Sequence, residues 1–237
     1  MSLFSLFKFN NPITVDIHSH ILPGIDDGVK SIEESIAIIK RFKMLGYTKL
    51  ITTPHIMSDS YPNTKEIILK QLSKVQDAVL ESEIDISIEA GAEHFIDLAF
   101  LELLEKREVL PFRKNYLLFE TSYTTRPIIL EQAIFEMLSQ GYIPVLAHPE
   151  RYLYLHGNIE HYKTLKALGV LFQVNIKSLH NSSSKIYKMA YKLIKLGLID
   201  FVGSDVHRMR DIDNMEKIIQ NREYKNIFKK NTIRNNI

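Results

Sequence analysis

The stretch V15-D-I-H-S-H-I-L-P-G-I-D-D-G28 places two histidines, His18 and His20, one residue apart and then two adjacent aspartates between glycines. Alternate side chains of an extended strand point the same way, so Asp16, His18 and His20 are expected to share one direction. A histidine pair alone is a weak signal, because such pairs are surface or core residues more often than ligands. Its meaning depends on the partners that the rest of the chain supplies.

The composition is that of a soluble globular protein. Of the 237 residues, 45% are hydrophobic and 24% are charged, and both values are ordinary for such a protein. We expect a single domain over residues 1–237, with an N-terminal arm at 1–12 and a basic, Asn-rich tail at 222–237 that frays. The arm is predicted to pack on the body or on a neighbouring subunit, and in the second case the protein would be a homo-oligomer.

The charge and the cysteine count exclude several classes of function. Thirty basic against 28 acidic residues give a formal charge of +2, which is too balanced for nucleic acid or an anionic membrane as the main partner. The chain has no cysteine, which removes disulfides, thiolate metal sites and cysteine nucleophiles, and is compatible with a cytoplasmic location. No apolar run approaches the roughly 18 residues that a membrane-spanning helix needs.

Short apolar runs alternate with longer amphipathic segments along the chain. The runs are rich in Ile, Val and Leu and predict buried parallel strands at 13–18, 49–53, 86–90, 116–120, 143–147, 170–175 and 200–203. The spacing of apolar residues predicts helices at 31–45, 64–80, 97–106, 128–138, 159–168, 185–196 and 212–221, the first with a capping box at Ser31 and Glu34. This alternation favours an α/β barrel or a doubly wound sheet.

Six of the seven predicted strands lead into a His, Asp or Glu residue. These residues are His18, His20, His55, Glu93, Glu120, His148, Asp205 and His207. In a parallel barrel the strand ends gather on one face, where barrel enzymes place their chemistry. Imidazole and carboxylate ligands without sulfur suit Mn²⁺, Fe²⁺ or Zn²⁺, and their number exceeds what one ion takes. Burying so many ionisable groups without ions would be very costly, so the sequence predicts a cluster of two or three metals.

Several motifs together resemble those of a known superfamily. They are D16-I-H-S-H20, the L-P-G-I-D-D-G segment, T53-P-H55, G91-A-E93, L146-A-H-P-E-R-Y152 and G203-S-D-V-H207. In this combination the chain resembles the PHP (polymerase and histidinol phosphatase) superfamily, and within it the bacterial metal-dependent protein-tyrosine phosphatases of capsule and exopolysaccharide synthesis. The resemblance spans residues 16 to 207 and implies a distorted, TIM-like (β/α)₇ barrel that holds three divalent metal ions, with Mn²⁺ as the first choice.

The resemblance also implies a ligand set. The first ion would be held by His18, His20, Glu93 and Asp205, the second by Glu93, Glu120 and His148, and the third by Asp27, His55 and His207. Asp27 rather than Asp26 is thus the implied ligand. Asp16 is expected to orient a histidine, and Asp26 either does the same or caps its turn.

The activity implied is hydrolysis of phosphotyrosine on proteins, by in-line attack of a hydroxide generated at the metals. Arg151, Arg210 and Asp205 are the residues expected to take part in catalysis. For Arg151 the alternative is a salt bridge with Glu150. The residues expected to contact the substrate are Arg151, Arg208, Arg210, Tyr123 and Arg126, with Tyr61 in a second rim loop.

Two other functions remain open. One is a small-molecule phosphatase of the histidinol-phosphatase kind, and the other is a non-catalytic metal-binding scaffold. The resemblance further implies an autophosphorylating tyrosine kinase of polysaccharide synthesis as the partner of the phosphatase. His94, next to Glu93, is expected to point away from the metals and to have a structural role.

Overall fold

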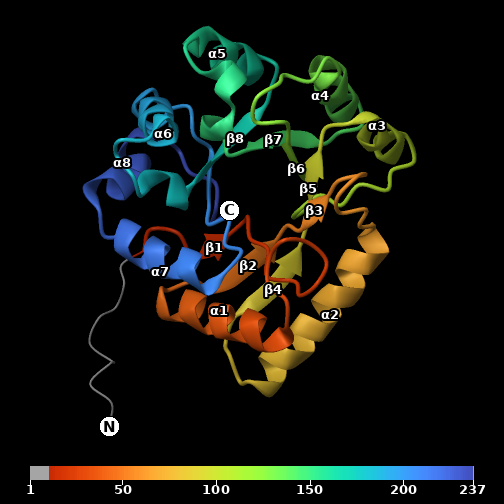
Figure 1. The fold of residues 1–237 in the computed structure, drawn as a ribbon, viewed down its shortest axis with the longest axis vertical. Coiled ribbons are helices and arrows are strands. Elements are labelled where there is room, and N and C mark those ends of the chain that lie inside the picture. The colour runs from red at the N-terminus through yellow and green to blue at the C-terminus, as the bar shows by residue number, and fades with distance from the viewer. Residues whose placement is uncertain (1–10, 237) are drawn as a thin grey trace.

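A computed structural model describes residues 11–236, so nearly all of the predicted N-terminal arm lies outside the described residues. Helices surround a central ring of short strands (Figure 1). The strands are β1 (Val15–Asp16), β2 (Lys49–Thr52), β3 (His55–Ile56), β4 (Ser87–Ala90), β5 (Glu93–Phe95), β6 (Tyr116–Glu120), β7 (Ile143–Ala147), β8 (Leu171–Asn175) and β9 (Phe201–Gly203). The α-helices are α1 (Ile32–Met44), α2 (Lys65–Glu81), α3 (Leu98–Glu105), α4 (Leu130–Ser139), α5 (Ile159–Ala167), α6 (Lys185–Lys195), α7 (Met209–Ile218) and α8 (Arg222–Lys230).

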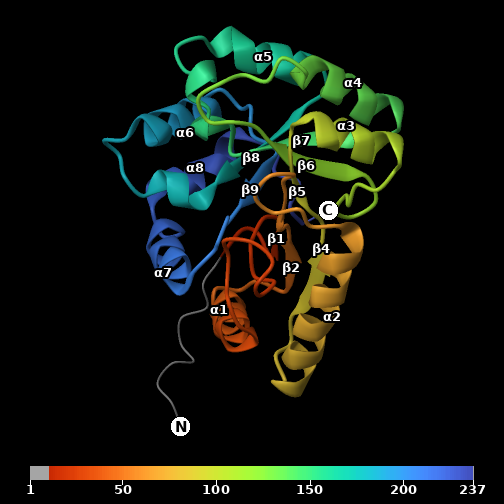
Figure 2. The ribbon, with the colours of Figure 1, turned by 45° about the vertical axis from the view of Figure 1, so that its right-hand side comes forward.

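Every pairing between these strands is parallel, in two sheets with the orders β1-β2-β4 and β3-β5-β6-β7-β8-β9. The smaller sheet lies beside α1 and α2 (Figure 2). The first and last strands meet beyond their ends, where Ser19 bridges Val206 and the N–H of Asp205 donates to the carbonyl of His18 (2.7 Å). The strands thus form a closed ring, and the predicted TIM-like (β/α) barrel is confirmed.

Two of the seven predicted strands are each followed, after a break, by a short strand that lies beyond the predicted bounds. The strand predicted at 49–53 is β2, and it is separated from β3 by Pro54, which has no N–H to donate to a ladder. Its neighbour β4 is separated from β5 at the same level by Gly91, where an added Cβ would lie 2.9 Å from the Cβ of Phe112. These two breaks turn His55 and Glu93 out of the smaller sheet and into the larger one, where the two residues are paired.

Six of the seven predicted helices begin within about two residues of the predicted position, whereas α7 begins at Met209, three residues before the predicted residue 212. Ser31 accepts a hydrogen bond from the N–H of Glu34 (3.3 Å), and the Glu34 carboxylate accepts from the N–H of Lys30 (2.7 Å). Thr64 and Asp97 cap α2 and α3 in the same way. One hydrophobic cluster packs the helices onto the strands, and a second gathers Leu118, Val145 and Phe201 with five other buried side chains. Leu118 lies two residues before Glu120 in β6, so this second cluster lies below the predicted ligands on the same face.

The prediction of a frayed C-terminal tail is wrong. Residues 222–230 form helix α8, which buries Tyr224 and Ile227. Beyond it, Asn235 is completely buried, and its amide group donates to the carbonyls of Val15 (2.9 Å) and Val202 (2.7 Å) and accepts from the N–H of Val202 (2.9 Å). These bonds join β1 to β9 at the end of the barrel opposite to the ligands.

The two ends of the described chain are neighbours. The side chain of Asn236 accepts a hydrogen bond from the N–H of Thr14 (2.9 Å) and donates to the carbonyl of Pro12 (3.1 Å). None of the helices in residues 11–236 is long and apolar enough to cross a membrane.

Candidate metal centre

All nine predicted ligands meet at the carboxyl ends of the strands. Their ligand atoms form four overlapping groups, in each of which the atoms lie within 4.8 Å of one another. The groups are His20, Asp27, His55 and His207; His18, His20 and Asp205; His18, Glu93 and His148; and His55, Glu93 and Glu120. Such overlap is what a cluster of ions that share ligands requires, whereas one ion would need only three or four of these residues.

Glu93, the first residue of β5, is central to the cluster. One of its carboxylate oxygens, Oε1, lies 2.9 Å from Nε2 of His148. The other, Oε2, lies 3.2 Å from Nε2 of His18 and 3.2 Å from Nδ1 of His55. A carboxylate with both oxygens among imidazoles is placed to bridge two ions.

The loop after β1 supplies two aspartates with different surroundings. Oδ1 of Asp27 lies 3.4 Å from Nε2 of His55 and 3.3 Å from Nε2 of His207, so Asp27 faces the ligands. Asp26 lies behind them: its Oδ2 is 2.8 Å from Nδ1 of His20, and its Oδ1 accepts from the N–H of Gly28 (2.9 Å). Asp26 therefore both orients a histidine and closes its own turn, and each aspartate has the surroundings expected for it.

Asp205 presents its two oxygens to two different environments. Oδ1 faces the imidazoles of His18, His20 and His207 at 3.8, 3.6 and 3.3 Å. Oδ2 accepts a hydrogen bond from the side-chain amide of Asn175 (2.6 Å). Only Oδ1 is thus directed at the predicted metals.

Two of the predicted ligands have a strained backbone. His148 has a φ of 32° and Asp205 a φ of 52°, in the left-handed region that residues other than glycine seldom adopt. Strain of this kind costs about 1–3 kcal/mol per residue and persists where the surroundings fix it, as at functional sites. It accompanies the turn of both side chains toward the cluster, at His148 directly after β7 and at Asp205 two residues after β9.

Several buried ligand atoms have no hydrogen-bond partner among the described residues. They are Oε2 of Glu93, Nδ1 of His55, Nδ1 of His148 and Oδ1 of Asp27. A buried polar atom without a partner is costly, and metal ions of the type that imidazole and carboxylate prefer would satisfy most of these atoms. The residues present therefore fit the implied ions.

The predicted histidine ligands differ in protonation. Against the effect of burial, Glu93 raises the pKa of His18 to about 9 and also raises that of His55, so a metal ion would have to displace protons from these two imidazoles. Burial lowers the pKa of His20 to about 4, with a further decrease from the neighbouring His207. Burial and the positive charge of Arg151 lower the pKa of His148 to about 4. Both imidazoles are neutral near pH 7, the form that binds a metal. Against the effect of burial, His18 and His55 hold the pKa of Glu93 well below its usual value, so Glu93 is a carboxylate.

Strand β8 supplies no ligand but links two of them. Nδ1 of His18 lies 2.7 Å from Oε1 of Gln173. The amide nitrogen of Gln173 donates to Oδ1 of Asn175 (2.8 Å), and the amide nitrogen of Asn175 donates to Asp205. Gln173 and Asn175 are completely buried. Gly203 leaves room for this series of hydrogen-bonded side chains, because a Cβ at position 203 would lie 2.5 Å from the amide nitrogen of Gln173. The sequence gives no charge to reveal these residues, and only their alternate positions on one strand point to them.

A cavity of about 280 Å³ opens over the cluster. Besides six of the nine predicted ligands, it is lined by four of the predicted substrate-contacting residues, Tyr123, Arg151, Arg208 and Arg210, and by Lys177 and Asp211. The guanidinium of Arg151 lies 4.4 Å above the centre of the Tyr123 ring and donates to Oδ2 of Asp205 (3.2 Å). Arg151 thus pairs with Asp205, and the alternative salt bridge with Glu150 is absent from the described ion pairs.

Two further predicted contacts have different outcomes. The ring of Tyr61 stacks on the imidazole of His55, with 5.4 Å between the ring centres, and so lies at the cluster. Arg126 does not line the cavity, because its guanidinium pairs with Glu131 in the first turn of α4. The expectation that Arg126 contacts the substrate is therefore not supported.

Asp16 does not have the expected role. Its carboxylate accepts from the N–H (2.9 Å) and the hydroxyl (2.7 Å) of Ser204, and no side chain of a histidine hydrogen-bonds to it. Because β1 ends at Asp16, the alternation that would have aligned it with His18 is interrupted. Asp16 instead fixes the residue before Asp205. His94 is structural as expected: its Nδ1 lies 3.1 Å from the carbonyl of Leu118, and its Nε2 accepts from the N–H of Leu110.

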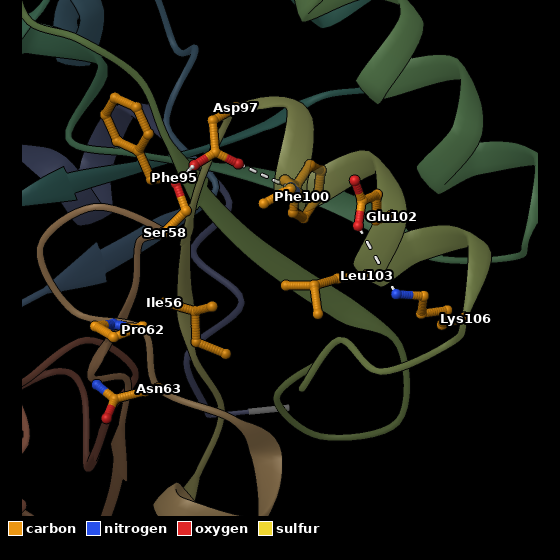
Figure 3. A pocket seen from close by; sticks show the side chains of 11 residues that line it. Ile56, Ser58, Pro62, Asn63, Phe95, Asp97, Phe100, Glu102, Leu103 and Lys106 are labelled. Carbon is orange, nitrogen blue, oxygen red and sulfur yellow. Dashed lines mark hydrogen bonds and ion pairs between the residues drawn. The ribbon is translucent and has the colours of Figure 1, made fainter.

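A second, more apolar cavity of about 180 Å³ lies between the loop after β3 and helix α3 (Figure 3). Ile56, Phe95 and Leu103 form its apolar wall, and Asp97 closes one side by accepting a hydrogen bond from Ser58 (2.7 Å). No predicted ligand lines this cavity, although Ile56 directly follows His55.

Comparison with known proteins agrees with this geometry. Residues 14–236 match the family described as "Capsular polysaccharide synthesis, CpsB/CapC". The tyrosine-protein phosphatase CpsB of Streptococcus pneumoniae is 32% identical over 204 residues, which cover 82% of this chain and 83% of that protein. The tyrosine-protein phosphatase YwqE of Bacillus subtilis is 30% identical over 198 residues, which cover 83% of this chain and 78% of YwqE.

The fold matches as well. A solved structure from work on YwqE and CpsB, described as unique metal-dependent tyrosine phosphatases, superposes with a TM-score of 0.81 and 26% identity, covering 91% of this chain and 90% of that one. The family expected from the motifs is thus confirmed. The chain belongs to the CpsB/CapC family of capsular polysaccharide synthesis.

Proposed function

We propose that this protein is a metal-dependent phosphomonoesterase that hydrolyses phosphotyrosine on proteins. The observation that carries the proposal is the convergence of nine imidazole and carboxylate side chains beneath a cavity that also holds Arg151, Arg208 and Arg210. An anionic substrate enters such a cavity readily, and a metal cluster at its base is suited to phosphate chemistry. Relatives that share about 30% of their residues with most of this chain carry the name tyrosine-protein phosphatase.

The ions proposed are three divalent metals, with Mn²⁺ preferred and Fe²⁺ or Zn²⁺ as alternatives. The ligands proposed are His18, His20, Glu93 and Asp205 for the first ion, Glu93, Glu120 and His148 for the second, and Asp27, His55 and His207 for the third. When bound, such ions activate water and neutralise phosphate charge.

The residues of this chain would position the substrate. Arg151 is fixed by Asp205 and by the ring of Tyr123, so its guanidinium can hold the phosphate with little loss of side-chain freedom. The half-exposed ring of Tyr123 stands beside it at the cavity wall and is placed to contact an aromatic leaving group. Arg210, exposed at the rim, would attract the phosphate or flanking acidic residues of a polypeptide.

The natural substrate proposed is an autophosphorylating tyrosine kinase of polysaccharide synthesis or export, met in the cytoplasm. The family assignment supports a link to capsule synthesis. Association of the protein into a homo-oligomer, suggested by the apolar sequence of the N-terminal arm, belongs to the same proposal.

The test is a comparison of a phosphotyrosine peptide, a phosphoserine peptide and histidinol phosphate as substrates. Each is measured after chelation, after return of Mn²⁺, and with His148→Ala. We expect metal-dependent turnover that favours phosphotyrosine and is lost in the variant. Preference for histidinol phosphate would instead place the protein with small-molecule phosphatases. Absence of turnover with Mn²⁺, Fe²⁺ and Zn²⁺ would indicate a scaffold.

A further inference from the structure

Lys177 occupies a place in the catalytic cavity that the sequence motifs do not indicate. It lies in the 3-10 turn Ile176–Leu179 that follows β8, two residues after Asn175. Ile176 and Leu179 are buried and anchor the turn. Lys177 itself projects its ammonium group into the cavity beside Arg151 and Tyr123.

The turn that carries Lys177 is held rigidly by Glu150. One oxygen of this completely buried carboxyl, Oε1, accepts from the N–H of Asn175 (3.0 Å) and from the hydroxyl of Ser178 (2.7 Å). The backbone on both sides of Lys177 is therefore fixed to the residue that precedes Arg151. Through this contact the two cationic side chains are set on one rigid unit at the cavity wall.

Three donors converge on a single oxygen of Asp205. Oδ2 is approached by the amide of Asn175 at 2.6 Å, the ammonium of Lys177 at 2.7 Å and the guanidinium of Arg151 at 3.2 Å. The hydrogen bond of the Lys177 ammonium goes to the main-chain carbonyl of Asp205 (2.8 Å), and its contact with Oδ2 is an ion pair, because Asn175 and Arg151 already fill the roughly two lone-pair directions of that oxygen. The side chain of Asn175 is completely buried, whereas the side chains of Lys177 and Arg151 are 31% and 28% exposed and can move within the cavity.

We propose that Lys177 binds the substrate phosphate directly. When a phosphorylated substrate enters, the ammonium group of Lys177 moves from Asp205 to a phosphate oxygen, and Lys177 and Arg151 hold the phosphate from two sides. Both cations already lie about 3 Å from the same oxygen, so a phosphate group beside Asp205 is within reach of both. An ammonium group suits this task because it acts as a mobile point charge next to the fixed fork of the guanidinium.

This inference rests on the proposed function, since it assigns a residue to the same site. It also separates two groups of cations in the cavity. Arg208 and Arg210 are exposed and make no side-chain hydrogen bond among the described residues, whereas Lys177 and Arg151 are fixed against Asp205. The second group, which lies against the predicted ligand Asp205, is therefore assigned a direct contact with the phosphate, in addition to any contact that Arg210 makes from the rim.

The experiment measures binding of inorganic phosphate to the Mn²⁺-loaded protein by calorimetry, together with kcat and KM for a phosphotyrosine peptide. Lys177→Met is compared with Lys177→Arg and with Lys188→Met, an exposed lysine of α6 outside the cavity. We expect Lys177→Met to weaken phosphate binding and kcat/KM about 10- to 100-fold, the usual range for loss of a charged hydrogen bond. Lys177→Arg should recover part of the loss, and Lys188→Met should behave as the wild type.

Metal content and thermal unfolding of each variant are measured in parallel. If Lys177→Met binds phosphate as the wild type does, the proposal is wrong. It is also wrong if the variant loses bound Mn²⁺ in proportion to its activity, because Lys177 would then act only by fixing Asp205. Phosphate binding can be measured without turnover. A wild-type protein that binds phosphate but does not hydrolyse phosphotyrosine would contradict the proposed function, and the binding data for the Lys177 variants would still test the role of Lys177. A wild-type protein that binds no phosphate would contradict both.

Discussion

The two ends of the barrel satisfy their buried polar groups in opposite ways. At the end that carries the ligands, Glu93, His55 and His148 each have a buried atom without a hydrogen-bond partner. At the other end, both the amide nitrogen and the oxygen of Asn235 are hydrogen-bonded to strand backbone. The polar groups compared are buried at both ends, but only at the end that carries Asn235 do they all have hydrogen-bond partners without an added ion.

This difference indicates which end is responsible for function and which for stability. Unsatisfied buried groups and left-handed backbone at His148 and Asp205 reduce stability and are retained where a ligand compensates. The end that carries Asn235 is called the closed end, and the end that carries the predicted ligands is called the ligand end. Fully hydrogen-bonded groups at the closed end stabilise the ring of strands itself. Substitutions at the two ends should therefore separate activity from stability.

The largest effect is expected from Asp27→Asn at the ligand end. The change removes a predicted ligand that lies against His55 and His207. Loss of a residue that merely supports a ligand costs about 10- to 100-fold in metal affinity or activity, so loss of a ligand should cost about 100-fold or more. Because the side chain is 45% exposed, the free energy of unfolding in chelator should change by no more than about 1 kcal/mol.

Activity with Mn²⁺ and urea unfolding in chelator measure the two quantities. Asp59→Asn, in the exposed loop after β3, is the matched control. A variant that keeps its activity but loses stability would reverse the comparison between the two ends.

Asn235→Ala at the closed end should have the converse result. It leaves the carbonyls of Val15 and Val202 and the N–H of Val202 without their partner. A cost of about 3 kcal/mol follows, which lowers Tm by roughly 6–12 °C for a chain of this size. At a temperature where the variant is folded, kcat and KM should equal those of the wild type.

Scanning calorimetry gives Tm, and Asn236→Ala, on an exposed neighbour, should lower it much less. Equal shifts in the two variants would mean that burial of Asn235 has no special importance.

Gln173→Leu tests whether strand β8 belongs to the ligand end, although it supplies no ligand. The change removes the partner of His18 and the donor to Asn175. We expect metal affinity to fall about 10- to 100-fold, because a ligating histidine is oriented by the bond of its other ring nitrogen. Competition of Mn²⁺ with a chelator measures the affinity, and Gln132→Leu, on the exposed face of α4 and outside the cluster, serves for comparison. Unchanged affinity in Gln173→Leu would restrict the site to its ligands.

The smallest effect expected is one of pH on stability, through Glu150. Burial raises the pKa of this carboxyl to about 7, against the hydrogen bond from Ser178. The folded state thus favours the protonated form, and the resulting stabilisation is complete below the ordinary pKa of 4.5 and is lost as pH rises through about 7. Glu150→Gln, which cannot ionise, should gain roughly 1 kcal/mol or more relative to the wild type between pH 5 and pH 8.

Urea unfolding of both proteins in chelator at the two pH values measures the difference. Asp16, whose pKa burial also raises to about 7, is present in both proteins and cancels. If the difference in free energy of unfolding between the two proteins is the same at pH 5 and pH 8, Glu150 is ionised in the folded protein at both pH values.

Much of the ligand end could be predicted from the sequence, because charged residues seldom follow one buried strand after another unless they share a site. His55, Glu93 and His148 are predicted in this way. Gln173 and Lys177 could not be predicted, since a glutamine carries no charge and a lysine after a strand is common on any surface. Their role depends on neighbours that only the closed ring brings together.

The closed end is the part least accessible to prediction. An Asn-rich segment is typical of a disordered tail, and nothing local in it indicates that Asn235 is buried. Its partners, Val15 and Val202, are distant in sequence, and backbone groups leave no pattern in the side chains. Strands β3 and β5 are likewise hidden, because each is very short and lies beyond the apolar run that predicts the strand before it.

The bonds from Asn236 to Thr14 and Pro12 bring the two ends of the described chain together beside the closed face. A short linker could therefore join residue 236 to residue 12, and new termini could be opened in the exposed turn at 181–183 before α6. Such a circular permutant would keep every ligand on its own strand. The order in which strands leave the ribosome would change while the catalytic face did not.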